Sequence, residues 1–169
     1  MPDNDSPYLA DPTRLPDVIA AIQTLGSYKF YKLDFATWAD RISADREKAP
    51  HWKGVFEQHP EFFRLDTEKK KASLVWRRQR PKTWHVDDGR LVPKAEYVAM
   101  PATLKARVSR APLTADEIKT LIDSAVDLHS RALESQKEKR WLRPLVVGGI
   151  GGILGAAIGP ILMKLLGLK

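Results

Sequence analysis

The chain has 169 residues, 43% of them hydrophobic and 29% charged, and a formal net charge of +7 at pH 7. This length accommodates one domain of ordinary size with its connections, and five tryptophans supply enough large apolar side chains to exclude a wholly disordered chain. The absence of cysteine excludes disulfides, thiolate metal sites and cysteine nucleophiles.

Residues 1–12 are polar and proline-rich, so we expect a flexible arm there. They lack the basic n-region and the apolar h-region of a secretory signal. Apolar residues then recur at helical spacing from Pro12 or Pro16 to Leu25, which predicts a helix, and Gly26 is expected to stop it.

A strand or extended connector is expected at residues 28–33, followed by two further helices. Asp34 is placed to cap a helix that runs to Ser43. Pro50 can open the next helix, and Pro60 ends it.

A β-hairpin follows in the pattern of residues 62–78. Residues 62–65 and 72–78 are the two predicted strands, and residues 66–71 form a charged turn between them. In element order, element lengths and the HPEFFRL step from third helix into strand, the stretch 13–80 resembles the winged-helix superfamily. The resemblance implies a small winged-helix-like domain with a basic wing.

Positive charge is concentrated around this hairpin, because residues 61–110 hold thirteen bases and six acids. Such a cluster attracts polyanions, which are nucleic acid or an anionic lipid surface, although a solvated hairpin surface explains it equally well. The candidate polyanion-contacting residues are Lys69, Lys70, Lys71, Arg77, Arg78, Arg80 and Lys82.

Residues 81–112 are interrupted by four prolines and are expected to be mainly a basic linker, with a short helix around Lys94–Ala99. Residues 113–143 are predicted to form a long amphipathic helix, which starts with a capping box at Thr114 and Glu117. Its apolar stripe needs a partner. Either the helix folds back on the domain or it pairs with a second copy as a short coiled coil.

Residues 144–169 contain an apolar, glycine-rich run that predicts a single transmembrane helix. At 1.5 Å per residue, residues 145–168 span about 36 Å, enough to cross the hydrocarbon core of a bilayer. Bases precede the run, so the positive-inside rule places the N-terminal part in the cytoplasm, as in a tail-anchored protein. The predicted membrane-interface residues are Lys137, Lys139, Arg140, Trp141, Arg143 and Lys164.

Glycines spaced four apart in this run predict close helix–helix packing in lipid, as in a glycine zipper. The predicted self-association residues are Gly148, Gly151, Gly152, Gly155 and Gly159. The alternative is that glycine is simply frequent in membrane helices.

No catalytic constellation, metal-ligand spacing or cofactor motif is found, so no enzyme activity or cofactor is expected. The expected fold class is α+β: a winged-helix-like domain, a long amphipathic helix and a C-terminal transmembrane helix. The first functional hypothesis is a self-associating membrane adaptor that binds an unidentified protein partner. The second is nucleic-acid binding at the membrane through the basic wing, and the third is a membrane-active, pore-type effector.

Overall fold

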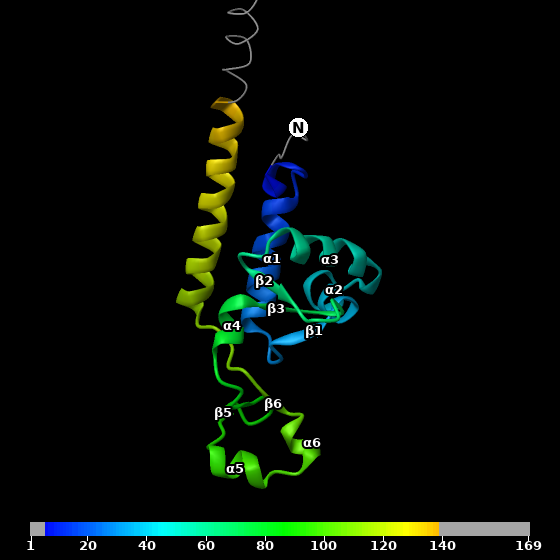
Figure 1. The fold of residues 1–169 in the computed structure, drawn as a ribbon, viewed down its shortest axis with the longest axis vertical. Helices are drawn as coiled ribbons and strands as arrows, with labels where there is room; N and C mark the ends of the chain where they lie inside the picture. Colours follow the sequence, from blue (N-terminus) through cyan, green and yellow to red (C-terminus); the bar gives the residue numbers. More distant parts are fainter. Residues whose placement is uncertain (1–5, 139–169) are drawn as a thin grey trace, which may run out of the picture. The chain divides into compact units, whose positions relative to one another are not determined.

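The structure is a computed structural model that describes residues 6–138 (Figure 1). The chain divides into two compact units, residues 1–129 and residues 130–169, and of the second unit only the helical residues 130–138 are described. The first unit is an α+β domain with two small antiparallel sheets in its described part. The predicted α+β class is therefore confirmed.

The first half of the domain follows the predicted order of helices and strands. Asp34 caps the second helix, because its Oδ1 accepts a hydrogen bond from the Thr37 N–H at 2.8 Å. Pro50 lies in the first turn of the third helix, where a missing N–H costs nothing, and Pro60 follows the end of that helix. The elements in order are η1 (Pro7–Leu9), α1 (Arg14–Ser27), β1 (Lys32–Asp34), α2 (Phe35–Ser43), η2 (Arg46–Lys48), α3 (Ala49–Gln58), β2 (Phe63–Leu65), β3 (Lys71–Leu74) and α4 (Val75–Gln79).

Strand β3 is the centre of the first sheet, with β1 on one side and β2 on the other, both antiparallel to it. Three strands this short are stable only when an apolar face is covered. The cover includes Trp38, which is fully buried and donates its indole N–H to the Ala72 carbonyl at 3.0 Å. The core around this contact contains Val18, Ile22, Leu25, Val55, Phe56, Phe63 and Leu74.

A flexible arm is expected at residues 1–12, but from residue 7 onward the structure shows an ordered segment. Residues Pro7–Leu9 form η1, and Tyr8 is only 5% exposed. The Tyr8 hydroxyl donates to Glu61 Oε1 at 3.1 Å, and its ring meets the His59 ring edge-on at 4.5 Å. Burial of this aromatic side chain ties the segment to the end of α3.

The second hairpin strand is shorter than predicted, and Gly26 does not stop α1. Strand β3 ends at Leu74, and Val75–Gln79 is the helix α4, so the strand predicted at residues 72–78 is wrong beyond Leu74. Helix α1 continues through Gly26 to Ser27. A tertiary contact explains this glycine, because a Cβ there would lie 2.9 Å from Ile118 Cγ1.

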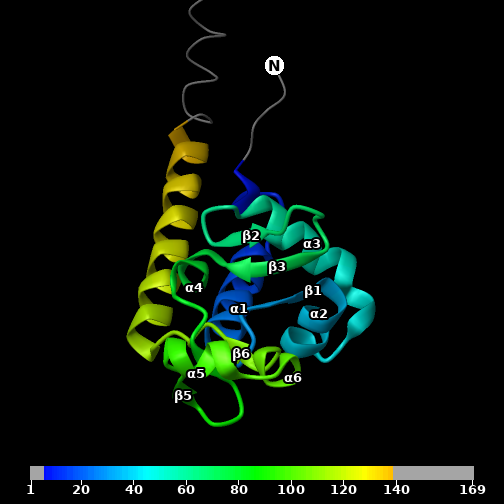
Figure 2. The same ribbon diagram turned by 60° about the horizontal axis from the view of Figure 1, so that its bottom comes forward.

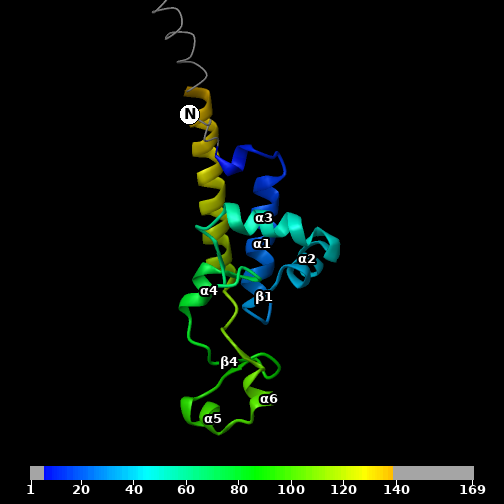
Figure 3. The ribbon, with the colours of Figure 1, turned by 45° about the vertical axis from the view of Figure 1, so that its right-hand side comes forward.

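Residues 81–112 form more than a linker. They contain a second sheet of strand order β5-β4-β6. The predicted helix at Lys94–Ala99 is confirmed (Figure 3). Ion pairs between Arg90 and Glu96 and between Arg107 and Asp87 connect its turns and helices. The elements are β4 (Trp84–His85), β5 (Arg90–Leu91), α5 (Lys94–Ala99), α6 (Ala102–Lys105) and β6 (Val108–Ser109).

Helix α7 (115–138) begins with the predicted capping box. The Thr114 N–H donates to Glu117 Oε2 at 2.7 Å, and the Glu117 N–H donates to Thr114 Oγ1 at 3.3 Å. Up to residue 129 the helix folds back beside α1, which is the first of the two predicted alternatives (Figure 2). Leu121 and Ala125 are buried there, whereas Val126 and Leu128 are exposed.

One buried side chain, Arg77 of α4, connects these parts. It is fully buried, and its Nη1 donates to the carbonyls of Leu25 and Tyr28 at 2.9 and 2.5 Å. Its Nη2 donates to the Arg110 carbonyl at 2.6 Å. Burial, with a smaller contribution from Arg80, lowers the pKa of Arg77 to about 10, so the guanidinium stays charged at neutral pH. Carbonyls at the negative end of α1 stabilise this charge.

We expect Arg77→Met to lower the free energy of unfolding by about 3 kcal/mol or more, because several buried carbonyls lose a charged donor. Arg77→Lys restores only part of the loss, since an ammonium cannot reach carbonyls on opposite sides as a guanidinium does. Urea denaturation followed by tryptophan fluorescence measures both. Arg78→Met is the matched control, because Arg78 is the exposed neighbour, and its change is expected within about 0.5 kcal/mol. Equal losses for both variants would contradict this role of Arg77.

The two helical glycines of α1 and α3 are expected to respond in opposite directions to alanine. Gly54→Ala gains up to about 1 kcal/mol of helix propensity, because a Cβ there meets nothing within 4 Å. Gly26→Ala loses about 1 kcal/mol net, because overpacking against the stiff, branched Ile118 outweighs the same gain. Thermal melting of the two variants checks this, and a stabilised Gly26→Ala would show that α1 and α7 are not in close contact.

Candidate functional site

The hairpin turn presents three of the predicted polyanion-contacting residues to solvent. Lys69, Lys70 and Lys71 are all exposed, and Lys69 has a positive φ of 53°. The turn is held by Asp66, whose Oδ1 accepts from the N–H groups of Lys70 and Lys71 at 2.8 and 3.1 Å. Desolvation opposes ionisation of Asp66, but these N–H donors and the nearby lysines lower its pKa. The backbone of the tip is thus fixed while all three lysine side chains are exposed, and the Lys70 ammonium lies 2.9 Å from Glu68.

Two of the predicted contact residues are unavailable to an anion. Arg77 is buried among carbonyls, as described above. Arg80 binds the Glu117 carboxylate and donates to the Pro112 carbonyl at 2.6 Å. Because α4 replaces the expected strand, these side chains turn inward, and we remove both from the polyanion-contacting set. Arg78 and Lys82 are exposed and stay in it.

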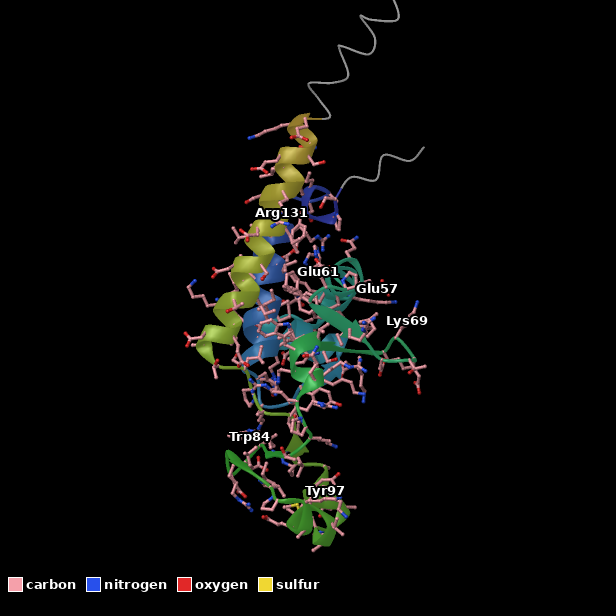
Figure 4. All side chains as sticks on the ribbon, turned by 60° about the vertical axis from the view of Figure 1, so that its left-hand side comes forward. Glu57, Glu61, Lys69, Trp84, Tyr97 and Arg131 are labelled. Atoms are coloured by element: carbon pink, nitrogen blue, oxygen red, sulfur yellow. The ribbon has the colours of Figure 1, made fainter. Side chains whose placement is uncertain are left out.

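An open groove of about 520 Å³ lies between the end of α3 and the hairpin. Figure 4 shows Glu57 and Lys69 along the same edge of the molecule, where this groove is found. Its lining combines apolar surface with two acids and two bases: Phe56, Glu57, Pro60, Phe63, Arg64, Leu65, Asp66 and Lys69. The groove is therefore mixed in character and carries no net formal charge.

A second open hollow, of about 400 Å³, shares Arg64, Leu65 and Asp66 with the groove. We name it the basic hollow, since four bases and one acid line it: Lys32, Arg64, Arg78 and Arg110 with Asp66, together with Tyr31, Leu65 and Thr67. Of the bases, only Arg78 was among the predicted residues. The missed signal is the strand register, because Lys32 and Arg64 both pair with Ser73.

The histidine contacts that the structure describes are with other side chains of the domain. His59 is fully buried, and its Nδ1 lies 3.0 Å from Glu61 Oε1. Burial, with Glu61 nearby, raises the pKa of Tyr8. Desolvation opposes ionisation of Glu61, but hydrogen bonds from His59, from its own backbone N–H and from Tyr8 together lower the pKa of Glu61. His51 lies 3.0 Å from Asp17. Within residues 6–138, no three metal-ligand side chains converge on one point.

Several sequence predictions lie outside the described residues. These are the anchor 144–169, its glycines Gly148, Gly151, Gly152, Gly155 and Gly159, and the interface residues Lys139, Arg140, Trp141, Arg143 and Lys164. Lys137 is described and is exposed in α7. No helix within residues 6–138 combines the length and the apolar character needed to cross a bilayer.

Comparisons of this chain with protein families, with curated proteins and with solved structures find no match.

Proposed function

We propose that the protein is a membrane-anchored adaptor whose winged-helix-like module binds a protein partner. The support for a winged-helix-like module is the order of elements: α1, β1, α2, α3, then the hairpin of β2 and β3, with all three strands in one antiparallel sheet. This is the order on which the sequence resemblance rests. The second sheet and the start of α7 are additions to it.

The observation that carries the proposal is the lining of the groove between α3 and the hairpin. Protein interfaces combine an apolar centre with a polar rim, and the groove offers both. A groove-reading helix for nucleic acid needs an excess of positive charge. Here Glu57 and Asp66 line the groove, and Lys53 on the same helix is 3.9 Å from Glu57. A protein surface fits this charge balance better than a phosphate backbone.

The membrane part of the proposal is supported by the sequence of residues 144–169. The apolar run is long enough to span a bilayer, and the bases before it favour a cytoplasmic domain. Its glycine spacing supports self-association, which would present several copies of the module together.

Nucleic-acid binding is kept as the second candidate because of one observation, the exposed tip of Lys69, Lys70 and Lys71. Lys70 is 2.9 Å from Glu68, which leaves Lys69 and Lys71 as the stronger phosphate contacts. Such contacts give affinity without reading sequence.

We expect the full-length chain to stay with the membrane fraction after an alkaline carbonate wash. The double variant Ile150→Arg, Leu154→Arg should be released, because each arginine costs about 2.5–3.5 kcal/mol at the centre of a membrane helix. Immunoblotting of pellet and supernatant measures both proteins. Release of the unaltered chain would contradict the anchor.

A photo-crosslinking amino acid at position 57 is expected to capture a discrete protein in cells. Glu57 is exposed and lines the groove, whereas position 47 is exposed in η2 and serves as the control that gives no adduct. Lys69→Glu, which reverses one charge of the groove, should weaken the adduct, and Lys48→Glu should not. A protease-sensitive, nuclease-resistant adduct supports the adaptor. An adduct removed by nuclease, or equal capture from both positions, would contradict it.

A further inference from the structure

We propose that the basic hollow is a binding site for clustered phosphate groups, such as the polyphosphate chain of a free nucleotide or the multiply phosphorylated head of a lipid. This site adjoins the partner-binding groove, with which it shares Arg64, Leu65 and Asp66, but it does not depend on the proposed function.

The strand register creates the two sides of the hollow. Lys32 on β1 and Arg64 on β2 both stand opposite Ser73 of the central strand β3. Directly paired residues of antiparallel strands project on the same face, and neighbouring strands lie about 4.8 Å apart. A lysine and an arginine therefore stand about 10 Å apart on one face of the sheet, on either side of Ser73, which is itself buried.

Two further arginines come from elements outside the sheet. Arg78 is presented by α4, and its Nη1 lies 3.5 Å from the Leu65 carbonyl. Arg110 follows β6, and its guanidinium lies over the Tyr31 ring at 4.9 Å. Its Nη1 donates to the Arg80 carbonyl, so both contacts hold the guanidinium in place. Residues distant in sequence thus supply bases to one concave surface.

The charge of the hollow is not neutralised by the domain itself. In the described part of the chain, none of its four bases lies within 4.0 Å of a carboxylate, whereas Arg80, Arg90 and Arg107 each have such a partner. The one acid of the hollow, Asp66, already accepts two backbone N–H groups at the hairpin turn. Four bases against one acid leave a local excess of three positive charges, which an anion would offset.

Shape selects a compact phosphate cluster rather than a nucleic-acid backbone. A hollow of about 400 Å³ is the size of a small-molecule site, and β1, β2, the hairpin turn and α4 all contribute to its lining. Guanidinium groups match phosphate oxygens with paired N–H donors, and three of the four bases are arginines.

The probe for the test is inorganic tripolyphosphate, titrated calorimetrically into the full-length chain in a neutral detergent at 100 mM salt. Arg64→Gln and Arg78→Gln are each expected to weaken binding at least tenfold, because each removes a charged donor. Both side chains are exposed, so their thermal melting should match that of the unaltered chain. Lys70→Gln removes the same charge from the hairpin turn without lining the hollow, and its change should stay below twofold.

Two competition arms distinguish the sources of the phosphates. A nucleoside triphosphate that displaces tripolyphosphate identifies a free ligand. Displacement only by vesicles containing a phosphorylated inositol lipid identifies a headgroup. No binding of tripolyphosphate at millimolar concentration would overturn the proposal. So would equal losses for Lys70→Gln and Arg64→Gln, or binding of duplex DNA that tripolyphosphate does not displace.

Discussion

The burial of one charged side chain organises this domain. A buried guanidinium is tolerated where hydrogen bonds satisfy most of its donors. Both terminal nitrogens of Arg77 donate to carbonyls rather than to a carboxylate, while its Nε has no hydrogen-bond partner among the described residues. Those carbonyls belong to the end of α1 and to Arg110, so three stretches that are distant in sequence must converge before the charge is stabilised. Strand β3 ends at Leu74, and the helix α4 that follows it directs the Arg77 side chain into the interior. Because Arg110 directly follows β6, the same side chain also links the second sheet to α1.

The hairpin of β2 and β3 contributes residues to two surfaces of the domain. Arg64, Leu65 and Asp66 line the mixed groove beside α3 and also the basic hollow. A single short strand therefore separates the proposed partner-binding groove from the proposed phosphate site. The Arg64 side chain contributes its charge to both linings.

Local signals in the sequence predicted local structure well. The cap at Asp34, the prolines around α3 and the capping box at Thr114 each act within one helical turn, and each is confirmed. Burial of Arg77 could not be predicted in this way, because its partners lie 33 to 52 residues away. Helical spacing predicted the apolar stripe of α7 but not that Ile118 of this stripe packs against Gly26. The basic hollow was missed for the same reason, since Lys32 and Arg64 meet only through pairing with β3.

Glu117 has a mechanical consequence for the long helix. The same carboxylate accepts the Thr114 N–H that starts α7 and binds Arg80 just after α4. Unwinding the first turn and releasing Arg80 are therefore one event rather than two. A load carried along α7 would be resisted at this clamp, at the close approach to Gly26 and at the buried Leu121 and Ala125 farther along. The first turns of the helix would therefore share such a load between an ion pair and apolar packing.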